Sequence, residues 1–130
     1  MTHSRILLVE DEPTHVRLFK DILEETHATV HVAGDGFEAL EAMKSATFDL
    51  VLMDLRLPRM GGMETTRRIR ESGPPHRDVP IIGMTAFTMP QDAEIGSDLG
   101  LTQCVAKPVD PDRFLATVSK YLPHSNLNSS

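Results

Sequence analysis

Four short apolar segments of this 130-residue chain each end in side chains that can do chemistry. These side chains are three carboxylates, one hydroxyl and one ammonium, and they belong to Glu10, Asp11, Asp54, Thr85 and Lys107. Clustered carboxylates are typical ligands of a hard divalent cation, and a cation together with an ammonium can neutralise a phosphoryl group during its transfer. The five residues therefore predict a site for phosphoryl chemistry, provided that the fold brings them together.

The apolar segments themselves predict the elements that would do so. Residues 5–9, 49–53, 79–84 and 102–106 form short apolar runs that do not alternate with polar residues. Such runs are typical of parallel strands that are covered on both faces. Residues 29–32 are more polar and predict a strand at an edge of the sheet.

Apolar residues at helical spacing fill the intervals between these strands. They predict helices over about 13–25, 35–46, 63–72, 88–99 and 110–122. Strict alternation of strand and helix predicts an α/β fold, a single doubly wound domain of five parallel strands with helices on both faces. The pattern leaves the strand order open between 2-1-3-4-5 and a Rossmann-like order. In either order the carboxyl ends of the strands meet at one edge, where ligands bind in such folds.

The acidic residues also have a simpler interpretation, as solvated loop carboxylates near the start of the next helix. Asp54 fits that interpretation poorly because it directly follows a buried strand. Two carboxylates about 4 Å apart repel by roughly 4 kcal/mol at an effective dielectric constant of about 20. A cluster of Glu10, Asp11 and Asp54 would therefore need a proton or a cation, and all-oxygen ligands favour Mg²⁺, Mn²⁺ or Ca²⁺ over zinc.

Other side chains have structural interpretations that are simpler than functional ones. Cys104 lies within a predicted strand, where a small apolar residue is more expected than a nucleophile. Arg67, Arg68 and Arg70 are expected on the solvent face of a helix, and the six histidines are expected to be scattered over the surface. The turn after the first strand contains no glycine, which disfavours a dinucleotide-binding site or a P-loop.

The composition limits the class of protein. A net charge of −6 argues against nucleic acid as a partner, and no apolar run approaches the roughly 20 residues that would span a bilayer. One cysteine excludes an internal disulfide and fits a reducing cytosol, and the N-terminus does not resemble a signal peptide, so we expect a cytoplasmic protein. We expect one domain over residues 1–123 and a polar, flexible tail over residues 124–130.

Four segments of the sequence resemble the receiver domains of response regulators in two-component signalling. They are Ile6–Asp11 (ILLVED), Met53–Met60 (MDLRLPRM), Ile81–Ala86 (IIGMTA) and Lys107–Pro108 (KP). The resemblance covers about residues 4–122 and implies the flavodoxin-like strand order 2-1-3-4-5 of the chemotaxis regulators. It also implies a phosphorylatable signalling domain that turns over only its own phosphoryl group, rather than an enzyme with an external substrate.

The resemblance implies how the acidic residues are used. Asp54 would be the phosphoacceptor, attacking phosphorus to form an acyl phosphate. Mg²⁺, with Mn²⁺ as a substitute, would be bound by Asp11, Asp54 and the backbone carbonyl of Arg56. Glu10 would contact the metal largely through a bound water.

The resemblance also implies a phosphoryl-binding and switching group on the last two strands. Thr85, Ala86 and Lys107 would contact the attached phosphoryl group, and a cis peptide bond before Pro108 would hold the lysine in place. Receivers often carry Tyr or Phe three residues before this lysine, and this chain has Cys104 there. The resemblance therefore does not extend to the usual aromatic readout of phosphorylation.

The implied partners follow from the same resemblance. A sensor histidine kinase or a histidine phosphotransfer protein would donate the phosphoryl group, and an unidentified downstream protein would bind the switched surface. We expect a monomer or a phosphorylation-dependent dimer, with neither direct nucleic-acid contact nor membrane insertion.

Two other functions compete with a phosphorylated receiver. Magnesium-dependent phosphatases with an aspartyl nucleophile need a second acid two residues later, and this chain has Arg56 at that position. A receiver-like module that only binds partners usually lacks one of the acids, the threonine or the lysine, and all of these are present here. A steady-state turnover assay would distinguish the phosphatase from the other two.

Overall fold

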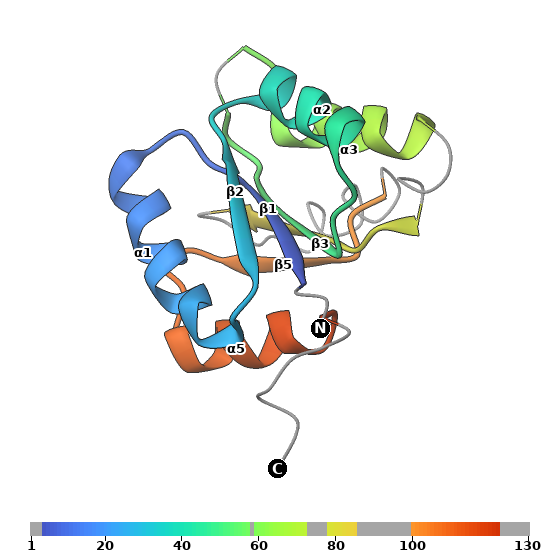
Figure 1. Ribbon diagram of the computed structural model, residues 1–130. Helices are drawn as coiled ribbons and strands as arrows, with labels where there is room; N and C mark the ends of the chain where they lie inside the picture. The colour runs from blue at the N-terminus through green and yellow to red at the C-terminus, as the bar shows by residue number, and fades with distance from the viewer. Residues whose placement is uncertain (1–3, 58, 73–77, 86–99, 123–130) are drawn as a thin grey trace.

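Five parallel strands form one sheet in the order β2-β1-β3-β4-β5 (Figure 1). The computed structural model describes residues 4–57, 59–72, 78–85 and 100–122. The strands are β1 (Arg5–Val9), β2 (Thr29–Ala33), β3 (Leu50–Asp54), β4 (Ile81–Thr85) and β5 (Gln103–Ala106). The doubly wound fold is confirmed, and the order is the one implied by the family resemblance rather than a Rossmann-like one.

The helices lie between the strands as the apolar spacing predicts. They are α1 (Pro13–Leu23), α2 (Gly36–Ser45), α3 (Gly62–Glu71) and α5 (Pro111–Ser119), with a short 3₁₀ helix, η1 (Glu24–Thr26), after α1. The helix predicted over about 88–99 lies outside the described residues. Within the described part of the chain, no helix has the length and apolar character to cross a membrane.

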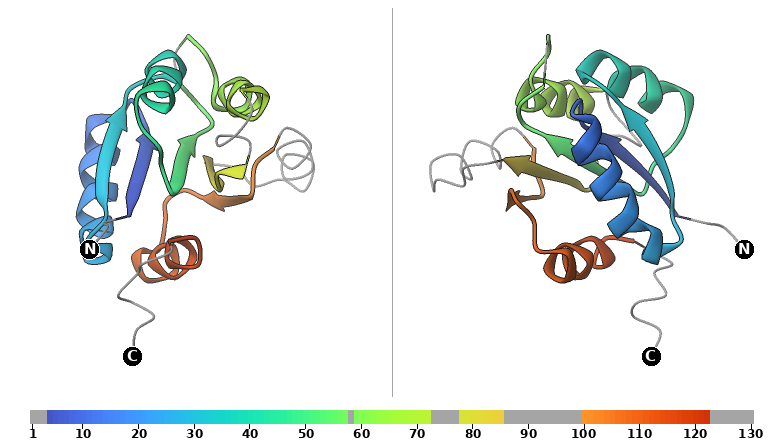
Figure 2. Two further views of the ribbon diagram at one scale, coloured as in Figure 1. Left: turned by 45° about the vertical axis from the view of Figure 1, so that its right-hand side comes forward. Right: turned by 90° about the vertical axis from the view of Figure 1, so that its left-hand side faces the viewer.

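The two faces of the sheet are covered by different helices (Figure 2). α1 and α5 pack on one face, where the rings of Phe19 and Phe114 lie 5.3 Å apart. α2 and α3 pack on the other, through buried residues such as Met43 and Ile69. Because successive residues of a strand point to opposite faces, β1 and β3 must be apolar at every position that is covered on both sides. This explains their uninterrupted apolar sequences.

Helix caps hold the chain close to the carboxyl edge of the sheet. Glu12 caps α1, accepting a hydrogen bond from the backbone N–H of Thr14, and Pro13 occupies the first turn. Asp35 caps α2 through the backbone N–H of Glu38, at 2.8 Å. Asp110 stands at the N-cap position of α5, but its side chain does not accept the expected capping hydrogen bond.

Arg70 departs from the solvent-facing position predicted for the three arginines of α3. Arg67 and Arg68 do face solvent, where both pair with Glu64. Arg70 is partly buried, and its guanidinium donates hydrogen bonds to the backbone carbonyls of Gly100 and Val79. It therefore ties α3 to the segments that lead into β4 and β5. Helical spacing could not reveal this role because its partners lie 9 and 30 residues away in sequence.

Gly62, at the start of α3, permits the chain to pass close to the end of β3. A Cβ at this position would lie 2.4 Å from the backbone oxygen of Asp54 and 2.7 Å from the Cα of Leu55, both impossible contacts. Gly61 is different, because a Cβ there would meet nothing within 4 Å and its φ of −65° suits any residue. Gly61 is also the N-cap of α3 and offers no side chain to the helix.

We predict opposite effects for substitutions at these adjacent glycines. Gly62→Ala should lower the free energy of unfolding by roughly 1–3 kcal/mol, because the backbone of β3 must move to admit a methyl group. Gly61→Ser should raise it by about 0.5–1 kcal/mol by supplying a helix cap and reducing the freedom of the unfolded chain. Urea unfolding of both variants tests this, and equal effects at the two positions would contradict it.

Candidate functional site

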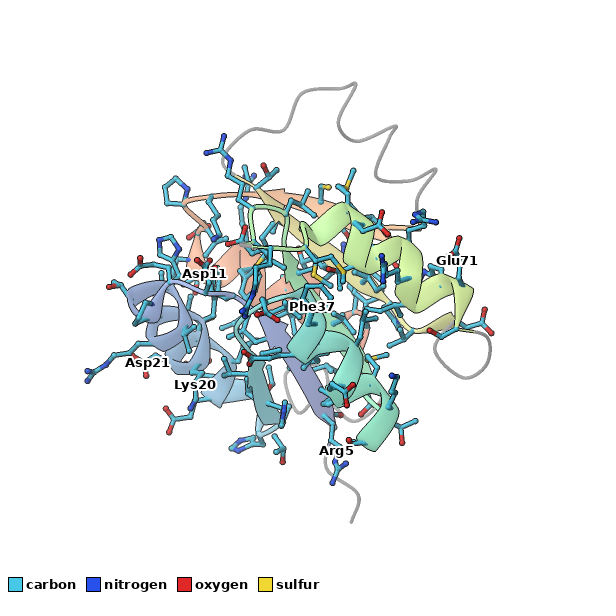
Figure 3. The ribbon with its side chains drawn as sticks, turned by 90° about the horizontal axis from the view of Figure 1, so that it is seen from above. Arg5, Asp11, Lys20, Asp21, Phe37 and Glu71 are labelled. Atoms are coloured by element: carbon cyan, nitrogen blue, oxygen red, sulfur yellow. The ribbon has the colours of Figure 1, made fainter. Side chains whose placement is uncertain are left out.

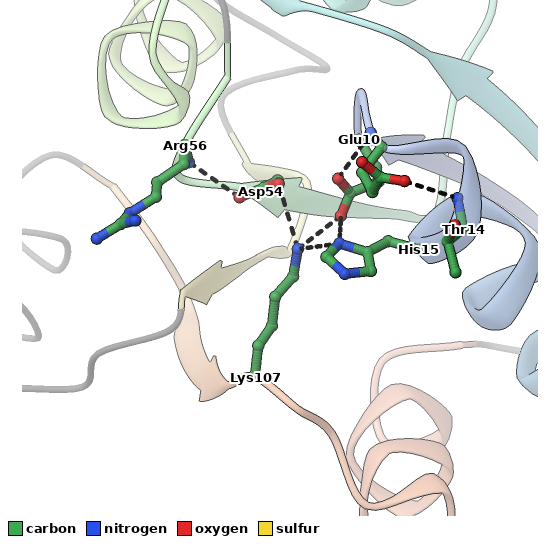
Figure 4. Close-up of polar contacts among 7 residues, drawn as sticks. Glu10, Thr14, His15, Asp54, Arg56 and Lys107 are labelled. Atoms are coloured by element: carbon green, nitrogen blue, oxygen red, sulfur yellow. Dashed lines mark hydrogen bonds and ion pairs between the residues drawn. The ribbon is translucent and has the colours of Figure 1, made fainter.

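The carboxyl ends of four strands carry the predicted site residues, and Figure 4 shows three of these residues, Glu10, Asp54 and Lys107, close together. Glu10 directly follows β1, Asp54 is the last residue of β3, Thr85 is the last residue of β4, and Lys107 directly follows β5. The parallel register fixes this convergence, since Thr85 pairs with Ala106 and the backbone N–H of Lys107 donates to the carbonyl of Thr85 at 2.8 Å.

The three acids form one cluster. Glu10, Asp11 and Asp54 each offer a carboxylate oxygen, and these oxygens lie within 4.8 Å of one another. Glu10 is 1% exposed and Asp54 is 6% exposed, whereas Asp11 is exposed to solvent. Asp11 lies near the start of α1, just beyond the carboxyl end of β1, whereas Arg5 is at the other end of that strand (Figure 3). An all-oxygen set that is buried on one side and open on the other fits a hard divalent cation that keeps some of its water.

Lys107 lies between the two buried carboxylates. Its Nζ is 2.7 Å from Oε1 of Glu10 and 3.2 Å from Oδ2 of Asp54, and its side chain is 15% exposed. The ammonium also lies 5.7 Å from the ring centroid of Phe19, on the inner side of α1. The Lys107–Pro108 peptide bond is cis. The ammonium thus offsets part of the negative charge that the acids would otherwise bury unpaired.

Backbone groups orient both buried carboxylates. The N–H of Arg56 donates to Oδ1 of Asp54 at 2.9 Å, and the N–H of Glu12 donates to Oε2 of Glu10 at 3.2 Å. Each carboxylate therefore has one oxygen on the backbone and the other on Lys107. These hydrogen bonds restrict rotation of the two carboxylates and keep the side chain of Asp54 at the carboxyl edge of the sheet.

His15 is a neighbour of the site that the sequence analysis missed. Its Nδ1 lies 3.3 Å from Nζ of Lys107 and 3.7 Å from Oε1 of Glu10. An ammonium can only donate, so a hydrogen bond between Lys107 and His15 requires Nδ1 to be the acceptor nitrogen. The sequence did contain one indication that His15 lies near the site. It follows Asp11 by four residues and lies in the first turn of a helix that begins at the site.

The remaining predicted residues lie around this core. Thr85 is half-buried on the strand beside Asp54, whose register partner is Met84. Cys104 pairs with Gly83, and its Sγ is 3.3 Å from the place where a Cβ of that glycine would stand. Cys104 is half-buried on the face that α2 and α3 cover. Ala86 lies outside the described residues.

Burial and charge perturb the protonation of Glu10. Removal from water raises the pKa of its carboxyl above the usual 4.5, and the hydrogen bond and negative charge of Asp54 raise this pKa further. The hydrogen bonds from Lys107 and from the N–H of Glu12 lower it, but by less than the combined rise. Glu10 is therefore easier to protonate in this site than an exposed glutamate would be.

We predict that this raised pKa appears in the pH dependence of stability. A carboxyl whose pKa is raised on folding adds stability below its unfolded pKa of 4.5, and that stability is lost as pH rises through the folded pKa. In EDTA, the stability of the wild type relative to Glu10→Gln should therefore increase as pH falls from about 7.5 toward 4.5. Denaturant unfolding of both proteins across this range measures the difference, and a difference independent of pH would contradict the assignment.

Comparison with known proteins agrees with this site. Residues 6–119 match the family described as the response regulator receiver domain. The chain is 34% identical over 122 residues to the polar-differentiation response regulator DivK of Brucella ovis, covering 94% of this chain and 98% of DivK. It is also 38% identical over 121 residues to the CAI-1 autoinducer sensor kinase/phosphatase CqsS of Vibrio cholerae, covering 92% of this chain but only 18% of that kinase.

A solved structure shares both the fold and a substantial part of the sequence. The receiver domain of the sensor histidine kinase PA1611 from Pseudomonas aeruginosa PAO1 superposes with a TM-score of 0.83 at 31% identity, covering 92% of this chain and 98% of that one. That structure is described as having a magnesium ion coordinated in its active-site cleft. The sheet order, the strand-end site and these relatives lead to one conclusion: the chain belongs to the response-regulator receiver domains of two-component signalling.

Proposed function

We propose that this receiver domain is switched by phosphorylation of Asp54. The observation that carries the proposal is the position of Asp54, whose carboxylate is grouped with Glu10 and Asp11 and lies 3.2 Å from Nζ of Lys107. An oxygen of Asp54 would attack the phosphorus of a phosphohistidine, forming an O–P bond as the P–N bond breaks. The electron pair of the broken bond leaves with the imidazole nitrogen, which takes up a proton.

The surrounding residues fit the charge changes of such a transfer. Glu10, Asp11, Asp54 and the backbone carbonyl of Arg56 would hold Mg²⁺, or Mn²⁺ in its place, and the magnesium site of the related PA1611 receiver supports this assignment. The bound cation would supply Lewis-acid neutralisation of the phosphoryl oxygens. Lys107 would move part of its hydrogen bonding from the carboxylates to the phosphoryl group.

The switch would run from the phosphoryl group toward β4 and β5. Thr85 at the end of β4 and Ala86, the next residue in the sequence, would bind the phosphoryl oxygens together with Lys107, favouring an active state of the domain. With Cys104 at the position of the usual aromatic residue, the change would be transmitted through a smaller side chain. The only turnover that we propose is loss of the domain's own phosphoryl group.

The partners that we propose come from the family. The phosphoryl donor would be a sensor histidine kinase or a histidine phosphotransfer protein. A downstream protein would recognise the phosphorylated receiver domain, which would be a monomer or a dimer. CqsS carries a similar domain within a much longer kinase, whereas DivK has almost the same length as this chain. We propose that this domain works in the cytoplasm, because its single cysteine fits a reducing compartment.

We predict that the protein gains one phosphoryl group from acetyl phosphate in a reaction that requires Mg²⁺ and Asp54. Intact-mass measurement should show the gain for the wild type and no gain for Asp54→Asn or for the wild type in EDTA. Asp21→Asn, which removes an exposed carboxylate on α1, is the matched control and should be phosphorylated as the wild type is. Unchanged phosphorylation of Asp54→Asn would refute the assignment of the phosphoacceptor.

A further inference from the structure

Asp35 and Arg59 form an ion pair outside the acidic cluster. Asp35 lies between β2 and α2 and is 1% exposed, and Arg59 lies between β3 and α3 with a side chain that is 69% exposed. The guanidinium of Arg59 donates from Nη2 to Oδ2 of Asp35. The contact joins two loops that are 24 residues apart in the sequence and lie at the carboxyl ends of strands.

The chemistry of Asp35 makes this contact specific. Its Oδ1 accepts the capping hydrogen bond from the N–H of Glu38, so the carboxylate is held at the start of α2 by one oxygen. A buried carboxylate is costly unless its charge is paired and its oxygens are hydrogen-bonded. The cap and the positive end of the helix dipole offset part of that cost, and Arg59 supplies the opposite charge.

The backbone of Arg59 shows that its loop is held in place. Its φ is +65°, in the left-handed region that residues other than glycine seldom adopt. Such a conformation is unfavourable for a residue with a Cβ and persists only where surrounding contacts impose it. Two features hold the backbone of Arg59 in this conformation: the ion pair with Asp35 and the burial of the adjacent Met60, which is 5% exposed.

This loop also carries groups of the site. The N–H of Arg56 orients Asp54, and the carbonyl of Arg56 is the backbone ligand proposed for the metal. One end of the loop is anchored because the N–H of Leu55 donates to the carbonyl of Met84 at 2.9 Å. The ion pair holds Arg59, which lies three residues after Arg56 in the same loop.

We propose that Arg59 is a positioning residue for the metal site, acting through Asp35 to hold the backbone of Arg56 where it can bind the cation. This inference rests on the proposed function, because it assumes a metal at the acidic cluster. Arg59 itself touches neither the acids nor the reacting atoms. Residues that orient metal ligands commonly change metal affinity by about 10–100-fold when they are removed.

The test is Mg²⁺ binding measured by calorimetry on the full chain. Arg59→Gln and Asp35→Asn should each bind Mg²⁺ about tenfold more weakly than the wild type, and asparagine keeps the helix cap that Asp35 provides. The double variant should be no weaker than the weaker single variant, because both changes break the same contact. Arg59→Lys should restore part of the affinity. Arg67→Gln, which breaks an exposed arginine ion pair on α3, is the control and should bind as the wild type does.

A second readout separates positioning from general destabilisation. In phosphorylation by acetyl phosphate, Arg59→Gln should need more Mg²⁺ for half-maximal rate yet reach a rate within about twofold of the wild type at saturating Mg²⁺. Wild-type affinity in Arg59→Gln, additive losses in the double variant, or a lower maximal rate with unchanged Mg²⁺ dependence would each overturn the inference. Failure of the wild type itself to bind Mg²⁺ would instead refute the proposed metal site.

Discussion

The arrangement of this site depends on two carboxylates that are buried beside a single ammonium. Glu10 and Asp54 end neighbouring strands at the same edge of the sheet, where their charges repel, and Lys107 from β5 lies between them. Without Lys107 the pair would be an uncompensated buried charge of the kind that costs several kcal/mol. One ammonium cannot balance three acids, so the site retains an affinity for a further cation. The proposed binding of a metal ion follows from that imbalance.

The rest of the fold fixes the positions of these charges. Parallel pairing sets which residues end each strand at the edge, and Gly62 allows the start of α3 to lie against the backbone of Asp54 and Leu55. Backbone N–H groups occupy the second oxygen of each buried carboxylate. The ion pair of Arg59 with Asp35 links the loop after β3 to the start of α2. Local hydrogen bonds therefore orient the acids, and more distant contacts position the loops that supply those bonds.

Much of this arrangement could be predicted from the sequence because it depends on local patterns. Uninterrupted apolar runs identify the central strands, and a polar residue at the end of each run identifies the edge where Glu10, Asp54 and Lys107 meet. The missed features depend on contacts between segments far apart in the chain. No periodic pattern in the sequence indicates the hydrogen bond from Arg70 to the carbonyl of Gly100, the approach of His15 to Lys107 or the left-handed backbone of Arg59. Periodicity also left the strand order open, because it describes single elements and not their neighbours.

We have proposed that side chains from four strand ends form one phosphoacceptor site. A crystal structure of the protein with Mg²⁺ and beryllium trifluoride, a tetrahedral mimic of the phosphoryl group, tests it most directly. We expect the mimic to be attached to a carboxylate oxygen of Asp54, with Nζ of Lys107 and the hydroxyl of Thr85 against its fluorines. We expect the metal to be held by Asp11, Asp54 and the carbonyl of Arg56. A mimic bound elsewhere, or a metal that does not touch these groups, would contradict it.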